Sequence, residues 1–180
     1  MDIVARAKAI ILSPATEWTF IEGEPGDVAG LYRNYIAILA AIPAVCRLVG
    51  GLLFGTDRIG HAILSAIVYY LLSLVAIYVV AWIVDALAQT FSGRKDFFSS
   101  LKLVGYSFTP AWLVGVFFLI PVLRFFAILG LYSFYLFYVG VPVMTKAPKD
   151  KVAAYTIVAL VCGVIAWILI FRIGHLIIHL

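Results

Sequence analysis

Five long apolar runs dominate the sequence and limit the folds open to it. They cover residues 35–54, 59–91, 103–120 and 125–144, and a last run extends from 152 past 171. Each is long enough to cross the hydrocarbon core of a bilayer, which takes about 20 apolar residues in a helix. In lipid, a single segment satisfies its own backbone hydrogen bonds only as a helix. The sequence therefore predicts an all-α polytopic membrane protein with five transmembrane helices.

Composition agrees with this prediction and narrows the function. Hydrophobic residues make up 65% of the 180 residues and charged residues 12%, against roughly 25% charged in soluble domains. With most residues committed to spanning helices, no room is left for a soluble catalytic domain. The 13 basic residues are scattered through short loops, where lipid headgroups explain them better than nucleic acid does. We expect the lipid bilayer as a partner and no nucleic acid.

The N-terminal residues show a different pattern. A helix over residues 2–12 would carry its apolar side chains on one face: Ile3, Val4, Ala7, Ile10 and Ile11. Such a helix is expected to lie in the headgroup plane. Ser13 followed by Pro14 is typical of a helix start and predicts a second short helix through Ile21, with Trp18 at the interface. The acidic stretch 22–27 that follows is interpreted as a solvated linker, with a divalent-cation loop as the alternative.

These patterns give a domain division and an orientation. We expect residues 1–33 to form a cytoplasmic N-terminal segment with the amphipathic helix, and 34–180 to form the five-helix transmembrane domain. Nine basic residues fall on the side of the N-terminus: Arg6, Lys8, Arg33, Arg94, Lys95, Lys102, Lys146, Lys149 and Lys151. Four fall on the other side: Arg47, Arg58, Arg124 and Arg172. The positive-inside rule then predicts a cytoplasmic N-terminus and an external or periplasmic C-terminus in the cytoplasmic membrane.

The third apolar run opens with Gly105-Tyr106-Ser107-Phe108-Thr109-Pro110. Pro110 lacks a backbone donor, so the Tyr106 carbonyl four residues earlier loses its helical partner. Hydroxyls such as those of Ser107 and Thr109, or a neighbouring helix, are expected to satisfy that carbonyl. We interpret Gly105, Tyr106 and Pro110 as structural residues at a kinked helix contact. Two further prolines inside apolar runs receive the same structural interpretation: Pro43 and Pro142.

Arg47 is the most unusual residue, because an ionisable side chain within a membrane span indicates a functional site by default. The helical rise argues against a pair with Asp85, which lies near the cytoplasmic end of the second run. We expect Arg47 to reach outward to Asp57 or to headgroup phosphates, and Asp85 to face Arg94 or Lys95. The alternative is a polar cavity that uses Arg47.

Two other sets of residues are candidates for binding. Tyr132, Tyr135 and Tyr138 recur every three residues and either line a polar path or pack against neighbouring helices. Three histidines are expected on the external side: His61, His175 and His179. They are weak candidates for a metal site, since no carboxylate or cysteine is spaced to join them. We therefore expect no bound metal and no cofactor.

Three short stretches carry a resemblance to a known family. They are Ala40-Ala41-Ile42-Pro43-Ala44-Val45-Cys46, Gly105-Tyr106-Ser107-Phe108-Thr109-Pro110 and Leu136-Phe137-Tyr138-Val139-Gly140-Val141-Pro142. With the five-span layout, they make the chain resemble the Yip1 family, specifically its short bacterial inner-membrane members. The resemblance implies that family's fold and topology. Its eukaryotic members are implicated in vesicle trafficking and bind Rab-type GTPases through their cytoplasmic parts.

Two functions are consistent with the sequence. The first is a non-enzymatic protein that organises or recruits a membrane or cytoplasmic protein partner, because no glycine-rich phosphate loop or catalytic triad spacing is present. The second is a small-solute, ion or lipid translocator that uses a cavity near Arg47 and the tyrosine row. A continuous polar cavity reaching the midplane would favour the second. Small residues on helix faces, such as the pair Ala159 and Gly163, also suggest a homo-oligomer.

Overall fold

The computed structural model describes residues 2–54 and 59–178, and every regular element in those ranges is a helix. The elements in chain order are α1 (Ile3–Leu12), α2 (Pro14–Gly23), α3 (Val28–Leu31), η1 (Tyr32–Ile36), α4 (Ala37–Leu53), α5 (Ile59–Ala88), α6 (Phe97–Ser107), α7 (Thr109–Leu113), η2 (Val114–Leu119), η3 (Pro121–Leu131), α8 (Tyr132–Met144) and α9 (Val152–Ile178). Most are α-helices, while η1 is a π-helix and η2 and η3 are 3₁₀-helices.

Five stretches within the described ranges are long and apolar enough to cross a membrane, as predicted: Val28–Leu53, Ile59–Ala88, Phe97–Leu119, Pro121–Met144 and Val152–Leu176. The first begins earlier than the apolar run, because the Asp27 side chain caps it by accepting a hydrogen bond from the Gly30 N–H at 3.2 Å. The third and fourth spans form a helical hairpin, with η2 packed against η3.

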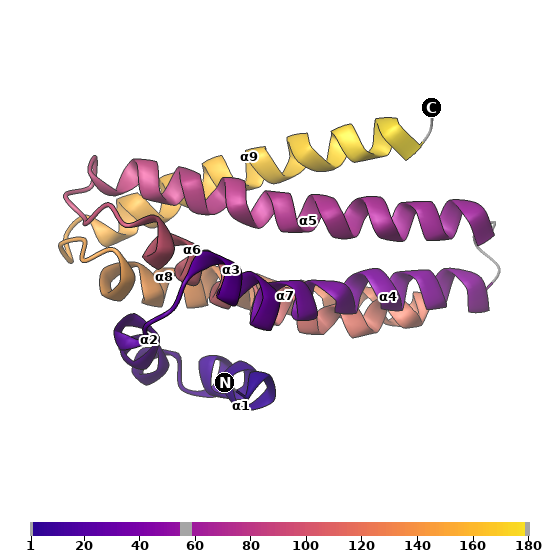
Figure 1. Ribbon diagram of the computed structural model, residues 1–180, viewed down its shortest axis with the longest axis horizontal. Helices are drawn as coiled ribbons and strands as arrows, with labels where there is room; N and C mark the ends of the chain where they lie inside the picture. Colours follow the sequence, from indigo (N-terminus) through magenta and orange to yellow (C-terminus); the bar gives the residue numbers. More distant parts are fainter. Residues whose placement is uncertain (1, 55–58, 179–180) are drawn as a thin grey trace.

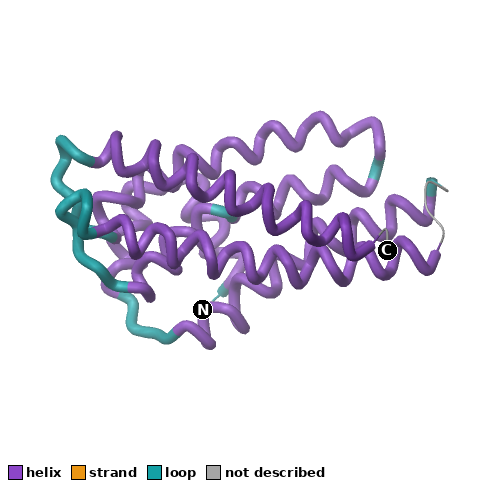
Figure 2. The backbone as a smooth tube through the Cα atoms, turned by 90° about the horizontal axis from the view of Figure 1, so that it is seen from above, coloured by secondary structure: helices purple, strands orange, loops and turns teal. Residues whose placement is uncertain are grey.

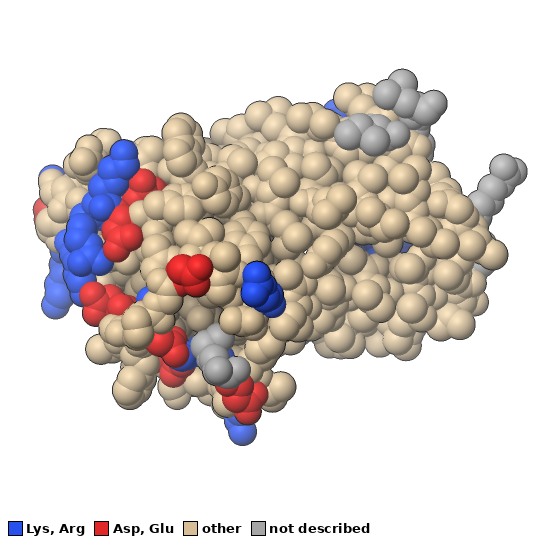
Figure 3. Space-filling view, in the orientation of Figure 1, with Lys and Arg blue, Asp and Glu red and all other residues tan. Residues whose placement is uncertain are grey.

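The spans form an elongated bundle in which α5 and α9 lie side by side and run in opposite directions (Figure 1). The links from α5 to α6 and from α8 to α9 lie at one end of the bundle (Figure 2). We call this the charged end, because most of the Lys, Arg, Asp and Glu side chains visible in Figure 3 gather there. The opposite end holds the turn between η2 and η3.

The third span is the centre of the bundle. In its most apolar stretch 61% of residues are buried, against 22–33% in the other four spans. Every residue from Ser99 to Ser107 in α6 is buried, and α6 contacts both α5 and α8. The chain therefore places its Gly-Tyr-x3-Pro motif in the protein interior rather than against lipid.

The two N-terminal helices form where they are predicted, and they pack against the bundle beside its charged end (Figure 1). The expected interfacial position of Trp18 is wrong. The Trp18 side chain is fully buried, and its Nε1–H donates a hydrogen bond to the Leu136 carbonyl of α8 at 3.1 Å. Gly140 makes room for the indole, since a Cβ there would lie 2.6 Å from Trp18 Cε2.

Candidate functional site

Arg47 lines a cavity of about 350 Å³ in the half of the bundle nearer the opposite end. Its guanidinium carbon lies 5.7 Å from the centre of the Tyr69 ring and 5.3 Å from that of the Phe118 ring. Rings at this distance stabilise the cation through their negative faces. No carboxylate of the described residues forms an ion pair with Arg47. The predicted partner Asp57 lies outside the described residues.

Aromatic side chains form the deeper wall of this cavity. Tyr69 stacks on Phe171 with ring centres 5.6 Å apart, Phe171 on Trp167 at 4.7 Å, and Trp167 on Phe108 at 5.2 Å. Two of the three hydroxyls that line the cavity form hydrogen bonds within the chain. Tyr70 donates to the Ala37 carbonyl at 3.1 Å and Ser73 donates to the Tyr70 carbonyl at 2.7 Å. The site is therefore one cation over an apolar aromatic surface.

The tyrosine row does not reach this cavity. Tyr132, Tyr135 and Tyr138 are at least one third exposed on the outer surface of α8. The Tyr132 hydroxyl donates a hydrogen bond to the Ile11 carbonyl of α1 at 3.0 Å, so one member of the row helps to hold the N-terminal helix. The residues lining the cavity come from other helices.

Asp85 is buried in α5, and its Oδ1 atom has no hydrogen-bond partner among the described residues. Arg94, one of its two expected partners, instead pairs with Asp96 at 3.0 Å. Asp96 lies only two residues from Arg94 and shares its loop, whereas Asp85 is enclosed by the bundle. Arg94 was expected to pair with Asp85 because the two residues are close in the sequence, but the carboxylate that Arg94 binds is that of Asp96.

The histidines lie on exposed positions at the opposite half of the molecule. His61 and His175 are exposed in α5 and α9, while His179 lies outside the described residues. In the described ranges, no cluster of three or more His, Cys, Asp or Glu side chains suits a metal ion.

The third span is interrupted at Phe108, two residues before Pro110, and a hydroxyl satisfies the carbonyl that Pro110 leaves open. The Thr109 hydroxyl donates to the Tyr106 carbonyl at 2.7 Å. The Tyr35 hydroxyl lies 2.7 Å from Thr109 Oγ1 and must donate to it, because the Thr109 hydrogen is already used. The Ser107 hydroxyl, the other expected donor, has no partner among the described residues.

The prolines and glycines mark close helix contacts. A Cβ at Gly105 would lie 3.1 Å from Ile36 Cδ1 of the first span. A Cβ at Gly115 would lie 2.6 Å from Pro43 Cβ. Pro142 lies inside α8, two residues after Gly140. The glycine contacts join the first span to the third, and Gly140 lets the fourth span approach Leu103 of the third span and Trp18.

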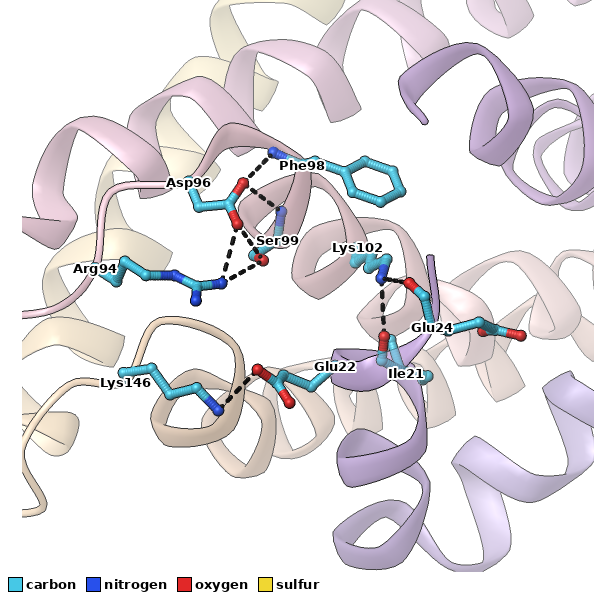
Figure 4. Close-up of polar contacts among 9 residues, drawn as sticks. All are labelled: Ile21, Glu22, Glu24, Arg94, Asp96, Phe98, Ser99, Lys102 and Lys146. Atoms are coloured by element: carbon cyan, nitrogen blue, oxygen red, sulfur yellow. Dashed lines mark hydrogen bonds and ion pairs between the residues drawn. The ribbon is translucent and has the colours of Figure 1, made fainter. Parts of the chain in front are cut away.

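At the charged end, ion pairs and hydrogen bonds fasten the N-terminal helices. Arg6 of α1 pairs with Glu17, and its Nη2 lies 2.7 Å from Glu24 Oε2. The Arg6 and Glu17 side chains are only 12% and 13% exposed. Lys102 of α6 is buried, and its ammonium donates to the carbonyls of Ile21, at 2.9 Å, and Glu24, where α2 ends (Figure 4).

Two acidic side chains at this end have pKa values below their usual range. Glu22 accepts a hydrogen bond from the Lys146 ammonium at 3.0 Å (Figure 4), and this contact lowers the pKa of Glu22. Burial raises the pKa of Asp96, but hydrogen bonds from the Ser99 hydroxyl and backbone N–H and the charge of Arg94 outweigh it and leave the pKa lowered. Both carboxylates stay ionised at neutral pH.

Sequence reasoning missed this set of contacts. Arg6 lies 11 residues from Glu17 and 18 from Glu24, and no helical spacing connects residues so far apart. One signal was present in Lys102, a charged residue beside an apolar run that was counted as an ordinary loop charge. A lysine one turn inside a helix that is otherwise apolar indicates a buried partner.

Comparison with known proteins identifies the family. A family model described as the Yip1 domain matches residues 8–170. Inner membrane protein YohC of Escherichia coli strain K12 is 24% identical over 165 residues, which cover 84% of this chain and 85% of the relative. The protein of the same name in E. coli O6:H1 strain CFT073 matches with the same identity and coverage. No solved structure matches this chain. The matched region contains all three stretches that carry the resemblance, and the chain belongs to the Yip1 domain family.

Proposed function

We propose that the protein is a non-enzymatic protein of the cytoplasmic membrane that organises or recruits protein partners at the cytoplasmic face. Nine of the 13 basic residues belong to the side of the N-terminus. By the positive-inside rule, the charged end of the bundle then faces the cytoplasm. The name of its Escherichia coli relatives, inner membrane protein, supports the membrane assigned. Val4 and Leu12 expose apolar side chains on α1, which supports contact of this helix with the headgroup region.

The observation that carries the proposal is the fastening of α1 and α2 to the bundle. Free N-terminal helices would leave the end of the bundle without a defined shape. Here, Arg6, Trp18 and Lys102 hold them through buried contacts. The loops at the charged end expose further charges such as Lys95 and Lys149, so this end presents charged side chains around helices of fixed position. A preorganised surface binds a partner without first losing conformational entropy.

Site-specific photocrosslinking in native membranes tests this role. A photoreactive amino acid replaces Lys95 or Lys149 at the charged end, and Val122, an exposed residue of the opposite end, serves as the matched control. We expect the same protein adduct from both charged-end positions and no such adduct from position 122. Absence of an adduct at the charged end, or the same adducts from both ends, would contradict the proposal.

A second candidate function is passage of a small anion or lipid through the cavity at Arg47. Its support is that the Arg47 guanidinium lies within a span and forms no ion pair with a carboxylate of residues 2–54 and 59–178. Apart from Arg47, the hydroxyls in the lining are those of Tyr69, Tyr70 and Ser73, too few for a continuous polar path, so a path would need to open by helix movement. Flux of a fluorescent anionic lipid in proteoliposomes tests this function. Flux equal to that of empty liposomes, or unchanged by Arg47→Gln, would exclude it.

A further inference from the structure

We propose that the cavity at Arg47 is a binding site for an anionic membrane phospholipid, with the lipid phosphate on the guanidinium and an acyl chain along the aromatic wall. This binding is independent of the recruiting role and of transport. A protein that holds the lipid without moving it would pass the test below and fail the flux assay.

The first step of the argument is the charge of Arg47. Its guanidinium is a cation that carries five N–H donors. Tyr69 and Phe118 face the cation with their rings, but rings accept no strong hydrogen bonds. The side chain remains more than one third exposed at the mouth of the cavity. An oxyanion is the ligand that satisfies both the charge and the donors of an arginine.

The second step is the depth of Arg47. It lies about 10 Å from the middle of the 26-residue span Val28–Leu53, at 1.5 Å per residue. The hydrocarbon core extends roughly 15 Å on each side of the midplane. The Arg47 Cα therefore lies roughly 5 Å inside the core, and its long side chain can reach the level of the phosphates. A lipid needs to move little to bring its phosphate to the guanidinium.

The third step is the shape and polarity of the cavity. Its volume of about 350 Å³ lies within the range of small-molecule sites. Most of the remaining lining is apolar, with Trp112, Trp167 and Phe171 as its largest apolar side chains, and alanines keep it open. The Tyr70 and Ser73 hydroxyls in the lining are already bonded to backbone carbonyls. A free phosphate or carboxylate ion would leave this apolar part unused. One cation above an apolar cavity is complementary to a molecule with an anionic head and a hydrocarbon chain.

Native mass spectrometry of the detergent-purified protein tests this proposal with phosphatidylglycerol as the probe. We expect Arg47→Gln to weaken phosphatidylglycerol binding by about tenfold or more, as for loss of a charged hydrogen-bonded contact. Arg124→Gln, the matched control at an exposed arginine of η3, is expected to leave binding unchanged. Equal binding by the wild type and Arg47→Gln would overturn the proposal.

Two further arms distinguish the lipid from other anions and guard against misfolding. Inorganic phosphate and glycerophosphoglycerol, which lacks acyl chains, are expected not to displace the lipid; displacement by either would identify a site for soluble anions instead. Ala66→Leu fills the cavity while keeping Arg47 and is expected to weaken binding as well. Full lipid binding by folded Ala66→Leu protein would show that the cavity does not hold the acyl chain.

Discussion

At the residue scale, the sequence correctly predicted that a carbonyl freed by Pro110 needs a new hydrogen-bond donor. It did not predict every hydroxyl that takes part. The proline identified the Tyr106 carbonyl as an acceptor that lacks its helical N–H donor, and Thr109 as one of two residues whose hydroxyl could replace that donor. Thr109 does so. The contribution of Tyr35 was not predictable, because it comes from another span 74 residues away and depends on how the helices pack.

Thr109→Val tests this hydroxyl chain. Valine keeps the side-chain shape but removes the hydroxyl that donates to the Tyr106 carbonyl and accepts from the Tyr35 hydroxyl. We expect a loss of about 1–3 kcal/mol in the free energy of unfolding, measured by denaturant titration in detergent micelles. Thr109→Ser restores the hydroxyl and is the control that should recover most of the loss. Wild-type stability in Thr109→Val would mean that the chain of hydroxyls contributes nothing.

Gly105→Leu tests the close contact between α6 and the first span. The added side chain would meet Ile36, whose Cδ1 lies 3.1 Å from the position of a Cβ at Gly105. Overpacking of this kind lowers stability by about 1–3 kcal/mol. Gly60→Leu is the control, since nothing lies within 4 Å of a Cβ there. If Gly105→Leu kept full stability but lost the crosslinked partner, the motif would be a recognition site rather than a structural one.

At the element scale, the sequence predicted the five spans well and the docking of α1 and α2 poorly. Span length and apolar character depend on neighbouring residues in the chain, so the sequence displays them directly. The place where α2 packs depends on Trp18, Gly140 and Lys102, which come from three separate elements. An amphipathic pattern in α1 fits a lipid surface and a protein surface equally well.

Lys102→Met tests what fastens α2. Methionine keeps much of the buried volume but leaves the carbonyls of Ile21 and Glu24 without their donor. We expect faster hydrogen exchange in residues 13–24, while exchange in the five spans stays at its wild-type rate. Lys95→Met, at an exposed lysine near the same end, should change neither. Unchanged exchange in α2 would show that Lys102 does not hold this helix.

The contact between Glu22 and Lys146 predicts a dependence on pH. The folded pKa of Glu22 is lowered, so its stabilising contribution is present above its ordinary pKa of 4.5 and is lost as the pH falls through the lowered value. We expect the difference in Tm between wild type and Glu22→Gln to be constant from pH 7 to about 5 and to shrink below 4.5. A difference that grew on acidification would have the wrong sign for this account.

At the scale of the whole molecule, the chain has two chemically different ends. The charged end holds the docked helices and most of the loop charges (Figure 3), whereas the opposite half contains the cavity at Arg47. The small residues Gly50, Gly115 and Gly163 contact other helices of the same chain. These glycines are therefore used in packing within the chain, and a homo-oligomer through small-residue helix faces stays a prediction.

The proposed recruiting role requires that the charged end face the cytoplasm. Cysteine labelling measures this orientation directly. In a variant with Cys46 and Cys162 replaced by alanine, single cysteines are placed at Lys95, Lys149 and Val122, all exposed. An impermeant maleimide is applied to intact cells, with permeabilised cells as the control for reactivity. We predict labelling in intact cells at position 122 only. Labelling at 95 or 149 in intact cells would contradict the account, because the charged end would then face away from the cytoplasm.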